Sequence, residues 1–349
     1  MEPHKICNKC VLPEIKPDIW LNEDGVCNIC VDYEKSKGTS EEKKPLETDF
    51  IKMLNMYKGN GKYDCLVMCS GGKDSTAALY YMKRKYRLNP LAFTFDHGFE
   101  TEGALENIKN AVEILGVDFL FFKSDLMKDM FSEILKSNSR AVICHPCSLW
   151  YMNLAFDIAA RFSIPIIIAG WTKGQSTSQP LMSRCGCNMH QQEFISMAKA
   201  TKEFLIQYKK DRPKYKDFPE SMEEVLTRAK KRQKCVVLSP HWFLPFGSET
   251  YVETIKKELK WKPAKLSYPN GTTNCYLNFI SVYNSIKYFG YTHYHVEMAK
   301  LIREGLLTRE EALDSLRVNF NIDFLNPIAK KLDYSFDDQY SDMRLGGNE

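Results

Sequence analysis

The sequence lacks the features that would place it in a membrane, in a secretory pathway or on a nucleic acid. No apolar run approaches the roughly 18 residues that a membrane-spanning helix needs, and residues 1–5 show no secretory hydrophobic region. The net charge of +4 is small for 349 residues. Charge therefore gives no general argument for nucleic acid, although it leaves room for a local basic patch. We expect a cytoplasmic protein without a membrane partner.

Cysteine, in contrast, is abundant. The chain has 12 cysteines in an otherwise ordinary globular composition, with 44% hydrophobic and 26% charged residues. Its length suits one large or two modest domains with a small appendage. In a chain without a secretory signal, so many cysteines indicate metal ligands or redox chemistry more than disulfides. Half of them occur in pairs with two residues between: Cys7/Cys10, Cys27/Cys30 and Cys144/Cys147.

Residues 1–33 form a small unit around the first two pairs. Sixteen residues separate these pairs, a spacing typical of sites in which four thiolates hold one zinc ion. The unit has too few apolar residues to fold alone, and a metal would supply the missing stability. We expect structural zinc on Cys7, Cys10, Cys27 and Cys30. Two unrelated pairs and a catalytic zinc are the alternatives, although four thiolates would leave no position for water.

A glycine-rich loop follows an apolar run at residues 65–69. The run is short and does not alternate, so it predicts a buried parallel strand. A helical pattern begins after the loop, and a helix N-terminus favours an anion because its N–H groups are free. The glycines allow a sharp turn and the close approach of a ligand. These features predict a polyphosphate site, with a plain glycine-rich turn as the alternative, at Ser70, Gly71, Gly72, Lys73, Asp74 and Ser75.

The run Ser-Gly-Gly-Lys-Asp-Ser at 70–75 is not a Walker A pattern, because its glycines are adjacent. It resembles the loop of the PP-loop ATP pyrophosphatases, whose fold is the adenine-nucleotide alpha-hydrolase type of α/β sandwich. The resemblance implies that Mg-ATP is cleaved between its α and β phosphates, that AMP passes to a carbonyl oxygen and that a nucleophile displaces it. Lys73 would neutralise charge in the transition state, Asp74 would hold the Mg²⁺ ion, and Ser75 completes the expected catalytic set.

Two further segments are expected at the same edge of the sheet. Asp96 and Gly98 follow an expected strand at 91–95, and Gly170 and Lys173 follow another at 164–169. Ligands of open parallel sheets lie beyond the carboxyl ends of the strands. We therefore predict that the first pair contacts the adenosine of ATP and that the second contacts phosphate or substrate. A plain strand-ending turn and a solvated loop lysine are the alternatives.

The chain as a whole predicts an α/β fold with a parallel sheet. We expect strands at 65–69, 91–95, 117–122, 164–169 and 236–240, and C-terminal helices at 276–287, 296–305 and 308–316. The predicted domains are a zinc ribbon at 1–33, a linker at 34–48, a PP-loop nucleotide-binding domain at 49–247 with an insertion at 176–234, and a helical C-terminal region at 248–349.

Two segments resemble the N-acetyl sugar amidotransferases. They are the ribbon, with Cys-Asn-Lys-Cys-Val-Leu-Pro at 7–13 and Gly-Val-Cys-Asn-Ile-Cys at 25–30, and the C-terminal run at 302–312. The resemblance implies conversion of a sugar acetamido group into an acetamidino group, in the biosynthesis of lipopolysaccharide, other surface polysaccharides or nonulosonic acids. The substrate would be a nucleotide-sugar or another small amide or carbonyl compound. Because the chain has no recognisable glutaminase part, separate subunits would supply ammonia.

Cys144, Cys147 and the distant Cys275 support a second interpretation. Two cysteines one helical turn apart and a distant third resemble the set with which some tRNA-thiolating PP-loop enzymes hold a 4Fe–4S cluster. One iron of that cluster stays open for sulfide, so the resemblance implies sulfur transfer to tRNA or to a small molecule. A second zinc with Cys275 or His145, a redox pair, and buried free cysteines are the alternatives.

The sequence departs from the tRNA thiolases in two places. Those enzymes usually carry an acidic pair after the fourth strand, where this chain has Lys-Gly-Gln at 173–175. They often carry a second zinc knuckle at the C-terminus, whereas no cysteine follows Cys275. Both departures make tRNA a weaker expectation than a small molecule. Cys185, Cys187 and His190 are a further, less specific metal candidate.

Overall fold

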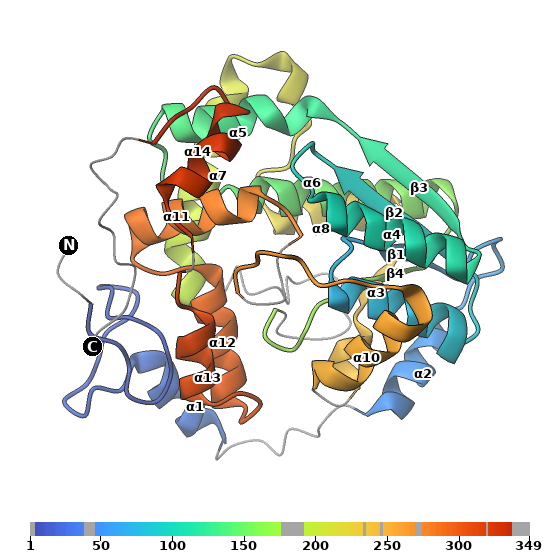
Figure 1. The fold of residues 1–349 in the computed structure, drawn as a ribbon, viewed down its shortest axis with the longest axis horizontal. Coiled ribbons are helices and arrows are strands. Elements are labelled where there is room, and N and C mark those ends of the chain that lie inside the picture. The colour runs from blue at the N-terminus through green and yellow to red at the C-terminus, as the bar shows by residue number, and fades with distance from the viewer. Residues whose placement is uncertain are drawn as a thin grey trace.

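A parallel sheet forms the centre of the structure, a computed structural model that describes residues 4–37, 46–175, 192–232, 235–244, 247–269, 274–318 and 320–336. Within these residues the sheet has five strands in the order β3-β2-β1-β4-β5, all parallel to their neighbours (Figure 1). They are β1 (Cys65–Met68), β2 (Pro90–Asp96), β3 (Asp118–Lys123), β4 (Ile166–Ile168) and β5 (Val236–Leu238). The α/β prediction is confirmed, and each strand lies within two residues of its predicted bounds.

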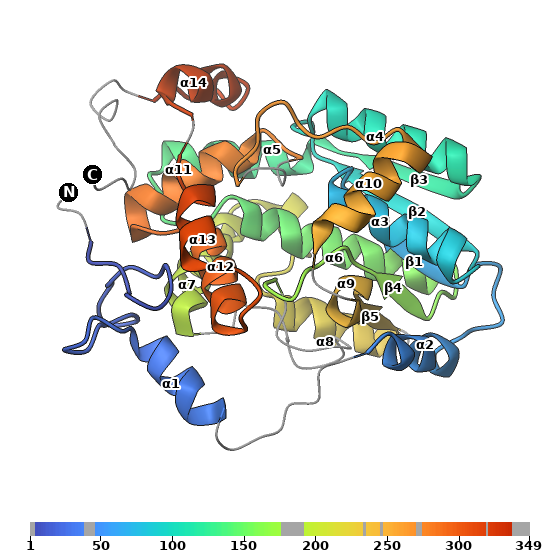
Figure 2. The same cartoon turned by 60° about the horizontal axis from the view of Figure 1, so that its bottom comes forward.

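Helices cover both faces of the sheet, as Figures 1 and 2 show. α3, α4 and α10 lie over one face, and α6 with α8 lies over the other. The α-helices of the described residues are α1 (Asn28–Lys37), α2 (Glu47–Met56), α3 (Lys73–Tyr80), α4 (Glu102–Leu115), α5 (Lys128–Lys136), α6 (Cys144–Arg161), α7 (Ile195–Lys210), α8 (Met222–Arg232), α9 (Pro240–Phe243), α10 (Ser248–Leu259), α11 (Leu277–Phe289), α12 (His293–Arg303), α13 (Arg309–Ser315) and α14 (Ile322–Lys330). A π-helical turn, Tyr81–Lys85, extends α3.

The double covering explains why four of the strands are buried and largely apolar. β1, β2, β4 and β5 are buried along their whole length, as expected for parallel strands with helices on both sides. Successive side chains of a strand point to opposite faces, so Cys65 and Val67 pack into one core whereas Leu66 and Met68 pack into the other. β3 is an edge strand, and Phe121 is exposed on it.

The N-terminal ribbon packs against the helical C-terminal region. Its buried side chains share one apolar cluster with residues of α12 and α13, including Val296 and Ala312. The Arg309 Nε of α13 donates hydrogen bonds to the carbonyl oxygens of Cys7, at 3.1 Å, and Cys10, at 3.0 Å. Figures 1 and 2 both show the ribbon beside α12 and α13. The two ends of the sequence therefore stabilise each other.

The predicted linker at 34–48 overlaps the ends of two helices. Residues 34–37 belong to α1 and residues 47–48 to α2, while 38–45 lie outside the described residues. α1 starts within the second cysteine pair, where Val31 N donates to the Cys27 carbonyl oxygen at 3.1 Å. The second cysteine pair therefore contains the first turn of α1, and the helix continues beyond the ribbon to Lys37.

In the predicted insertion at 176–234, α7 and α8 pack against α6 and add Leu205 and Leu226 to the core. Residues 176–191, with Cys185, Cys187 and His190, lie outside the described residues. α14 was not among the predicted C-terminal helices, and Pro327 lies inside it.

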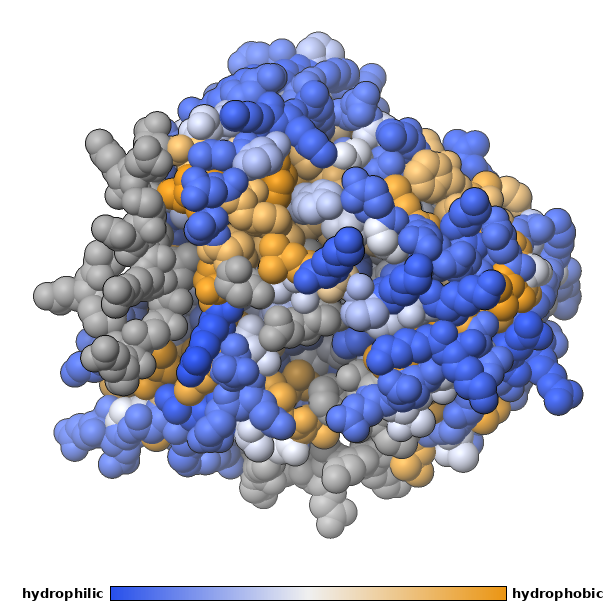
Figure 3. Space-filling view, viewed as in Figure 1, coloured by the Kyte–Doolittle hydropathy of each residue, from blue (hydrophilic) through white to orange (hydrophobic). Residues whose placement is uncertain are grey.

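Hydrophilic side chains dominate the face of the molecule seen in Figure 3, especially over α4 and α10. Apolar residues show on the same face near α11 and α14. Among the described residues, no helix combines the length and apolar character that crossing a membrane requires.

Candidate functional site

The loop between β1 and α3 is closed by hydrogen bonds between its own ends. Ser70 N donates to Ser75 Oγ at 3.1 Å, and the two hydroxyl oxygens lie 3.1 Å apart. Gly72 stands at the N-cap position, so α3 begins at Lys73. The loop therefore leads directly into the first turn of a helix, where the helix dipole and N–H groups favour an anion.

Glycine is required in and beside this loop. Gly71 has φ +78°, and a Cβ on it would lie 2.2 Å from the Ala104 carbonyl oxygen. The carbonyl oxygen of Gly71 accepts hydrogen bonds from Asn107 Nδ2, at 3.1 Å, and from Trp261 Nε1, at 3.0 Å. Gly170, which follows β4, lies so close to α3 that a Cβ would meet Ser75 N at 2.6 Å. The loop is thus packed between α4 and the segment after β4.

Lys73 and Asp74 form an ion pair at the start of α3. Their Nζ and Oδ2 atoms lie 2.7 Å apart, and the two side chains are 17% and 21% exposed. The Asp74 carboxylate also accepts a hydrogen bond from the Tyr251 hydroxyl, and His241 Nε2 lies 2.8 Å from the Asp74 carbonyl oxygen. A bound polyphosphate or metal ion would therefore share these two side chains with existing partners. Tyr251 and His241 were not found by sequence reasoning.

The other predicted nucleotide contacts lie at the carboxyl ends of β2 and β4. The Asp96 carboxylate is buried and accepts a hydrogen bond from Gly98 N at 2.7 Å, in a turn in which Gly98 has φ +88°. Asp96 thus stabilises the strand-ending turn, and contact with adenosine stays a prediction. The Lys173 carbonyl oxygen accepts a hydrogen bond from Lys300 Nζ of α12 at 2.7 Å, which holds its loop against that helix.

Glu297 of α12 is a site residue that sequence reasoning missed. Its Oε1 accepts a hydrogen bond from Thr172 Oγ1 at 3.1 Å. Burial raises the pKa of Glu297 to about 7, although Thr172 and the charge of Lys73 act in the opposite direction. A carboxylate is therefore present beside the loop at 172–175, but it comes from a helix 125 residues further along the chain. The residues next to Glu297 in the sequence do not indicate that it lies beside this loop.

The cysteines of the second interpretation line one cavity beside the loop. Cys144, Cys147 and Cys275 share a cavity of about 240 Å³ with Ser70 and Asn274. Asn274 Nδ2 donates a hydrogen bond to Ser70 Oγ at 3.1 Å, which joins the cavity wall to the loop. Burial raises the pKa of Cys144 to about 11 and raises those of Cys147 and Cys275 as well. Without a metal, all three therefore carry their protons at neutral pH.

His97 and Glu100 contact Cys275 in the same cavity. His97 Nε2 lies 3.4 Å from Glu100 Oε1 and 3.7 Å from Cys275 Sγ. Burial lowers the pKa of His97 to about 4 and raises that of Glu100 to about 8. Sequence reasoning included His97 only within the segment 96–98 that is expected to contact the adenosine, and it did not single out Glu100. Neither residue has a local signal, because Cys275 is 178 residues away from His97.

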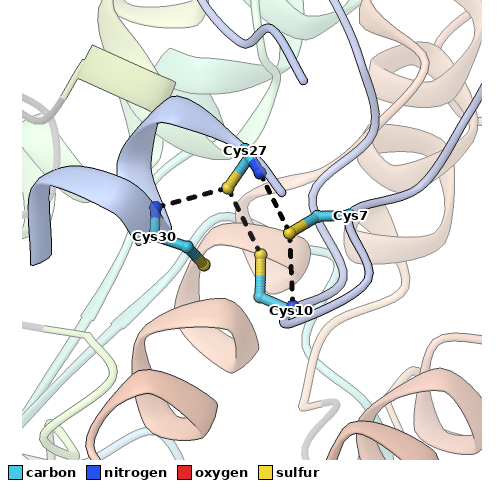
Figure 4. Close-up of side chains that lie close together, drawn as sticks. All are labelled: Cys7, Cys10, Cys27 and Cys30. Carbon is cyan, nitrogen blue, oxygen red and sulfur yellow. Dashed lines mark hydrogen bonds between the residues drawn. The ribbon is translucent and has the colours of Figure 1, made fainter. Parts of the chain in front are cut away.

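The four ribbon cysteines are gathered as the sequence predicts (Figure 4). The Sγ atoms of Cys10 and Cys27 lie 3.7 Å apart, and all four side chains are at most 2% exposed. Backbone N–H groups point at the sulfurs, as in the bond from Cys27 N to Cys7 Sγ at 3.2 Å. Such bonds stabilise thiolates. The side chains of histidine, cysteine, aspartate and glutamate are possible metal ligands. Among the described residues, only this group and the His97–Glu100–Cys275 group place the ligand atoms of three or more of them within 4.8 Å of one another.

A buried ion pair lies beside the ribbon. Arg303 of α12 lies 3.2 Å from the Glu193 carboxylate, and the two side chains are 7% and 4% exposed. Arg303 also lines a pocket with Cys30. A guanidinium near four thiolates would offset the negative charge that a metal–thiolate centre carries.

Comparisons with known proteins agree with this geometry. Residues 64–147 match the family described as Queuosine biosynthesis protein QueC. This segment contains β1, the loop, β2 and the first cysteines of α6. The chain has an α/β PP-loop fold. A four-cysteine cluster precedes this PP-loop domain, and helices follow it. The match supports the predicted ATP pyrophosphatase superfamily and an ATP-using enzyme.

Three other proteins are similar to most of this chain. The uncharacterized protein MJ1599 of Methanocaldococcus jannaschii is 25% identical over 312 residues, which cover 83% of this chain and 92% of that protein. The U34-tRNA thiolase NcsA from Methanococcus maripaludis, solved with its 4Fe–4S cluster, is 14% identical with a TM-score of 0.33, covering 87% of this chain and 90% of that one. NMN synthetase from Francisella tularensis is 12% identical with a TM-score of 0.38, covering 82% and 95%. These structural similarities are too low to transfer a function.

Replacing Gly71 by alanine should destabilise the protein. The substitution forces a left-handed backbone on alanine and drives its Cβ into the Ala104 carbonyl oxygen, so we expect a loss of about 2 kcal/mol or more in the free energy of unfolding. Gly103→Ala is the matched control, because no atom lies within 4 Å of its added Cβ, and it should leave stability equal or higher. Urea denaturation measures both. Equal stability of the two variants would contradict the packing described for the loop.

Glu297 should make the folded state less stable as pH rises from about 4.5 to 7. Over this window the unfolded chain releases the proton that the folded chain keeps, because the folded pKa is about 7 and the ordinary value is 4.5. Glu297→Gln should remove a decline on the order of 3 kcal/mol. Urea denaturation at pH 4.5 and pH 8 measures it. Glu253→Gln, at a side chain that is 73% exposed, should retain the wild-type pH dependence, and an unchanged profile in Glu297→Gln would refute the assignment.

Proposed function

We propose that this protein is an N-acetyl sugar amidotransferase, which activates the amide oxygen of a small sugar substrate with ATP and then inserts nitrogen. ATP would lose pyrophosphate, the substrate oxygen would bond to the α-phosphorus, and ammonia would then expel AMP. The observation that carries the adenylation step is the closed loop from Ser70 to Ser75, which leads into the first turn of α3 beside Lys73.

The loop suits the departing pyrophosphate because positive charge and N–H groups converge there. Lys73 Nζ lies 2.7 Å from Asp74 Oδ2. When ATP binds, the ammonium group would turn to the phosphates and neutralise their negative charge. Asp74, relieved of this partner, would bind the Mg²⁺ ion that ATP brings, while Tyr251 keeps the carboxylate oriented. Asp96, Gly98, Gly170 and Lys173 are the proposed contacts for the rest of the nucleotide.

The proposal of nitrogen transfer is supported by the two segments that resemble the amidotransferases. The ribbon and residues 302–312 are far apart in sequence, yet Arg309 binds the carbonyl oxygens of Cys7 and Cys10. The resemblance thus covers one continuous unit of the folded chain. A separate glutaminase would supply the ammonia, since no glutaminase part is recognisable here.

The ribbon would hold zinc in a structural role. A zinc ion with thiolates at about 2.3 Å places the sulfurs about 3.8 Å apart, close to the 3.7 Å between Cys10 and Cys27. Four thiolates close the coordination sphere, so this centre would stabilise the ribbon and take no part in the reaction.

Sulfur transfer is the second candidate, and the cavity favours it. Cys144, Cys147 and Cys275 line the same space as Ser70 of the loop. Three thiolates there are the donor set for a 4Fe–4S cluster with one open iron, which would bind sulfide next to the activated substrate. The acceptor would then be a small molecule or tRNA.

Purified protein with ATP, an N-acetylated nucleotide-sugar and ammonium chloride should release AMP and pyrophosphate. Lys73→Ala should lower the rate by about 100-fold or more, because it removes a charge that stabilises the transition state. Lys109→Ala, on a side chain that is 73% exposed on α4, is the control and should keep full activity. Chromatography of the nucleotides gives the result. Release of ADP in place of AMP would overturn the adenylation mechanism.

Nitrogen and sulfur transfer differ in cofactor and product. For the amidotransferase we expect anaerobically purified protein to contain zinc without iron or sulfide, and ¹⁵N-ammonia to appear in the product by mass spectrometry. Iron and sulfide in equal amounts, lost in Cys144→Ser, together with a product containing sulfur, would replace the first proposal by the second.

A further inference from the structure

We infer that His97, Glu100 and Cys275 form a binding site for one divalent transition-metal ion, separate from the ribbon centre. The site goes beyond the proposed function, because neither adenylation nor transfer of nitrogen requires it. The imidazole nitrogen, carboxylate oxygen and thiol sulfur of these residues all lie within 4.8 Å of one another.

The two separations from the His97 nitrogen match edges of a coordination tetrahedron, and the third, between the Glu100 oxygen and the Cys275 sulfur, is within 4.8 Å. With zinc–nitrogen and zinc–oxygen distances of about 2.0–2.1 Å and a zinc–sulfur distance of about 2.3 Å, a tetrahedron places nitrogen about 3.4 Å from oxygen and about 3.6 Å from sulfur. The structure has 3.4 Å between His97 Nε2 and Glu100 Oε1 and 3.7 Å between His97 Nε2 and Cys275 Sγ. The first of these is longer than the 2.7–3.2 Å of a good N–H···O hydrogen bond.

The backbone fixes the three donors. His97 and Glu100 stand on either side of the turn that follows β2, and Glu100 forms an antiparallel bridge with Cys275. Around this bridge, Tyr276 N donates to the Phe99 carbonyl oxygen at 2.9 Å and Thr101 N donates to that of Asn274 at 2.9 Å. The three residues therefore lie on two backbone segments, 97–101 and 274–276, that hydrogen bonds hold side by side.

The surroundings of His97 leave its ring without a full set of partners. The side chain is 3% exposed and packs among the rings of Phe95, Phe99 and Phe131, with centroids 5.6–6.0 Å away. Its Nδ1 is buried without a hydrogen-bond partner among the described residues. An ion held by Nε2 would balance the cost of burying this imidazole beside a carboxylate and a thiol, while Nδ1, on the other side of the ring, would stay without a partner among the described residues.

One nitrogen, one oxygen and one sulfur donor form a mixed set that suits zinc and its neighbours in the first transition row. Three protein ligands leave a fourth position open, as in catalytic zinc sites. All three residues line the cavity that Ser70 and Asn274 also line. A water molecule or a small nucleophile bound to the ion would therefore share that space with the ATP-binding loop.

The single ion and a 4Fe–4S cluster are mutually exclusive, because each would use the Cys275 thiolate. Cys144 and Cys147 line the cavity but do not belong to the group whose ligand atoms lie within 4.8 Å of one another. Their substitution therefore separates the two arrangements, and Cys144→Ser is the matched control for variants of the proposed ligands.

The test is the metal content of the full chain after gel filtration with a weak chelator, measured by elemental analysis together with acid-labile sulfide. We expect about two zinc ions per wild-type chain, one of them in the ribbon. His97→Ala and the isosteric Glu100→Gln should each retain about one, whereas Cys144→Ser should retain both. The ribbon ion is an internal reference for folding, because a variant that fails to fold would lose it too.

Cobalt substitution provides a second measurement. The difference spectrum between cobalt-loaded wild type and cobalt-loaded Glu100→Gln should show thiolate-to-cobalt absorption from a site with a single sulfur ligand. Wild-type protein with one zinc, or a Glu100→Gln variant that retains both ions, would overturn the inference. Iron and sulfide that disappear in Cys144→Ser would do the same and would show that the three cysteines hold a cluster.

Discussion

The hydrogen bonds that other segments donate to loop 70–75 are the constraint on which the site depends. The Gly71 carbonyl oxygen accepts from Asn107 and Trp261, and the Ser70 hydroxyl accepts from Asn274. These donors are largely buried, and leaving any of them unpaired would cost about 1–3 kcal/mol. The conformation of the loop therefore depends on the packing around it, and that packing depends on the loop in turn. The packed elements are α4 and the segments at 261–262 and 274–275. The same crowding explains why Gly71 and Gly170 have no room for a side chain.

Environment divides the cysteines into classes that composition alone does not distinguish. The four ribbon thiols lie at ligand distances and receive backbone N–H groups. Cys69 is buried in the core beside β1, where burial raises the pKa of its thiol to about 12, so it acts as a small apolar side chain. Cys144, Cys147 and Cys275 form the third class, because they are only partly buried and line a cavity next to the loop.

Much of the fold could be predicted because its signals are local. Apolar runs marked every strand, and the glycine pair marked the turn into α3. Asp96 and Gly98 lie at a strand end as expected, where Gly98 N donates to the Asp96 carboxylate, and their contact with adenosine stays a prediction. Glu297 and Trp261 could not be found, since each acquires its role from a residue 125 or 190 positions away. In the sequence they look like an ordinary helix acid and an ordinary core aromatic.

By itself the sequence determined the strand–loop–helix unit around Ser70 and the four-thiolate ribbon. Both depend on residues that are close along the chain, so spacing and residue type suffice to specify them. Only the tertiary structure decided which partners Cys275 has. The backbone bridge between Glu100 and Cys275 brings its thiol to His97, while Cys144 and Cys147 stand on α6 across the same cavity. The contact between Cys275 and His97 depends on how the ends of strands and the helices pack against one another, and the spacing of residues along the sequence does not predict it.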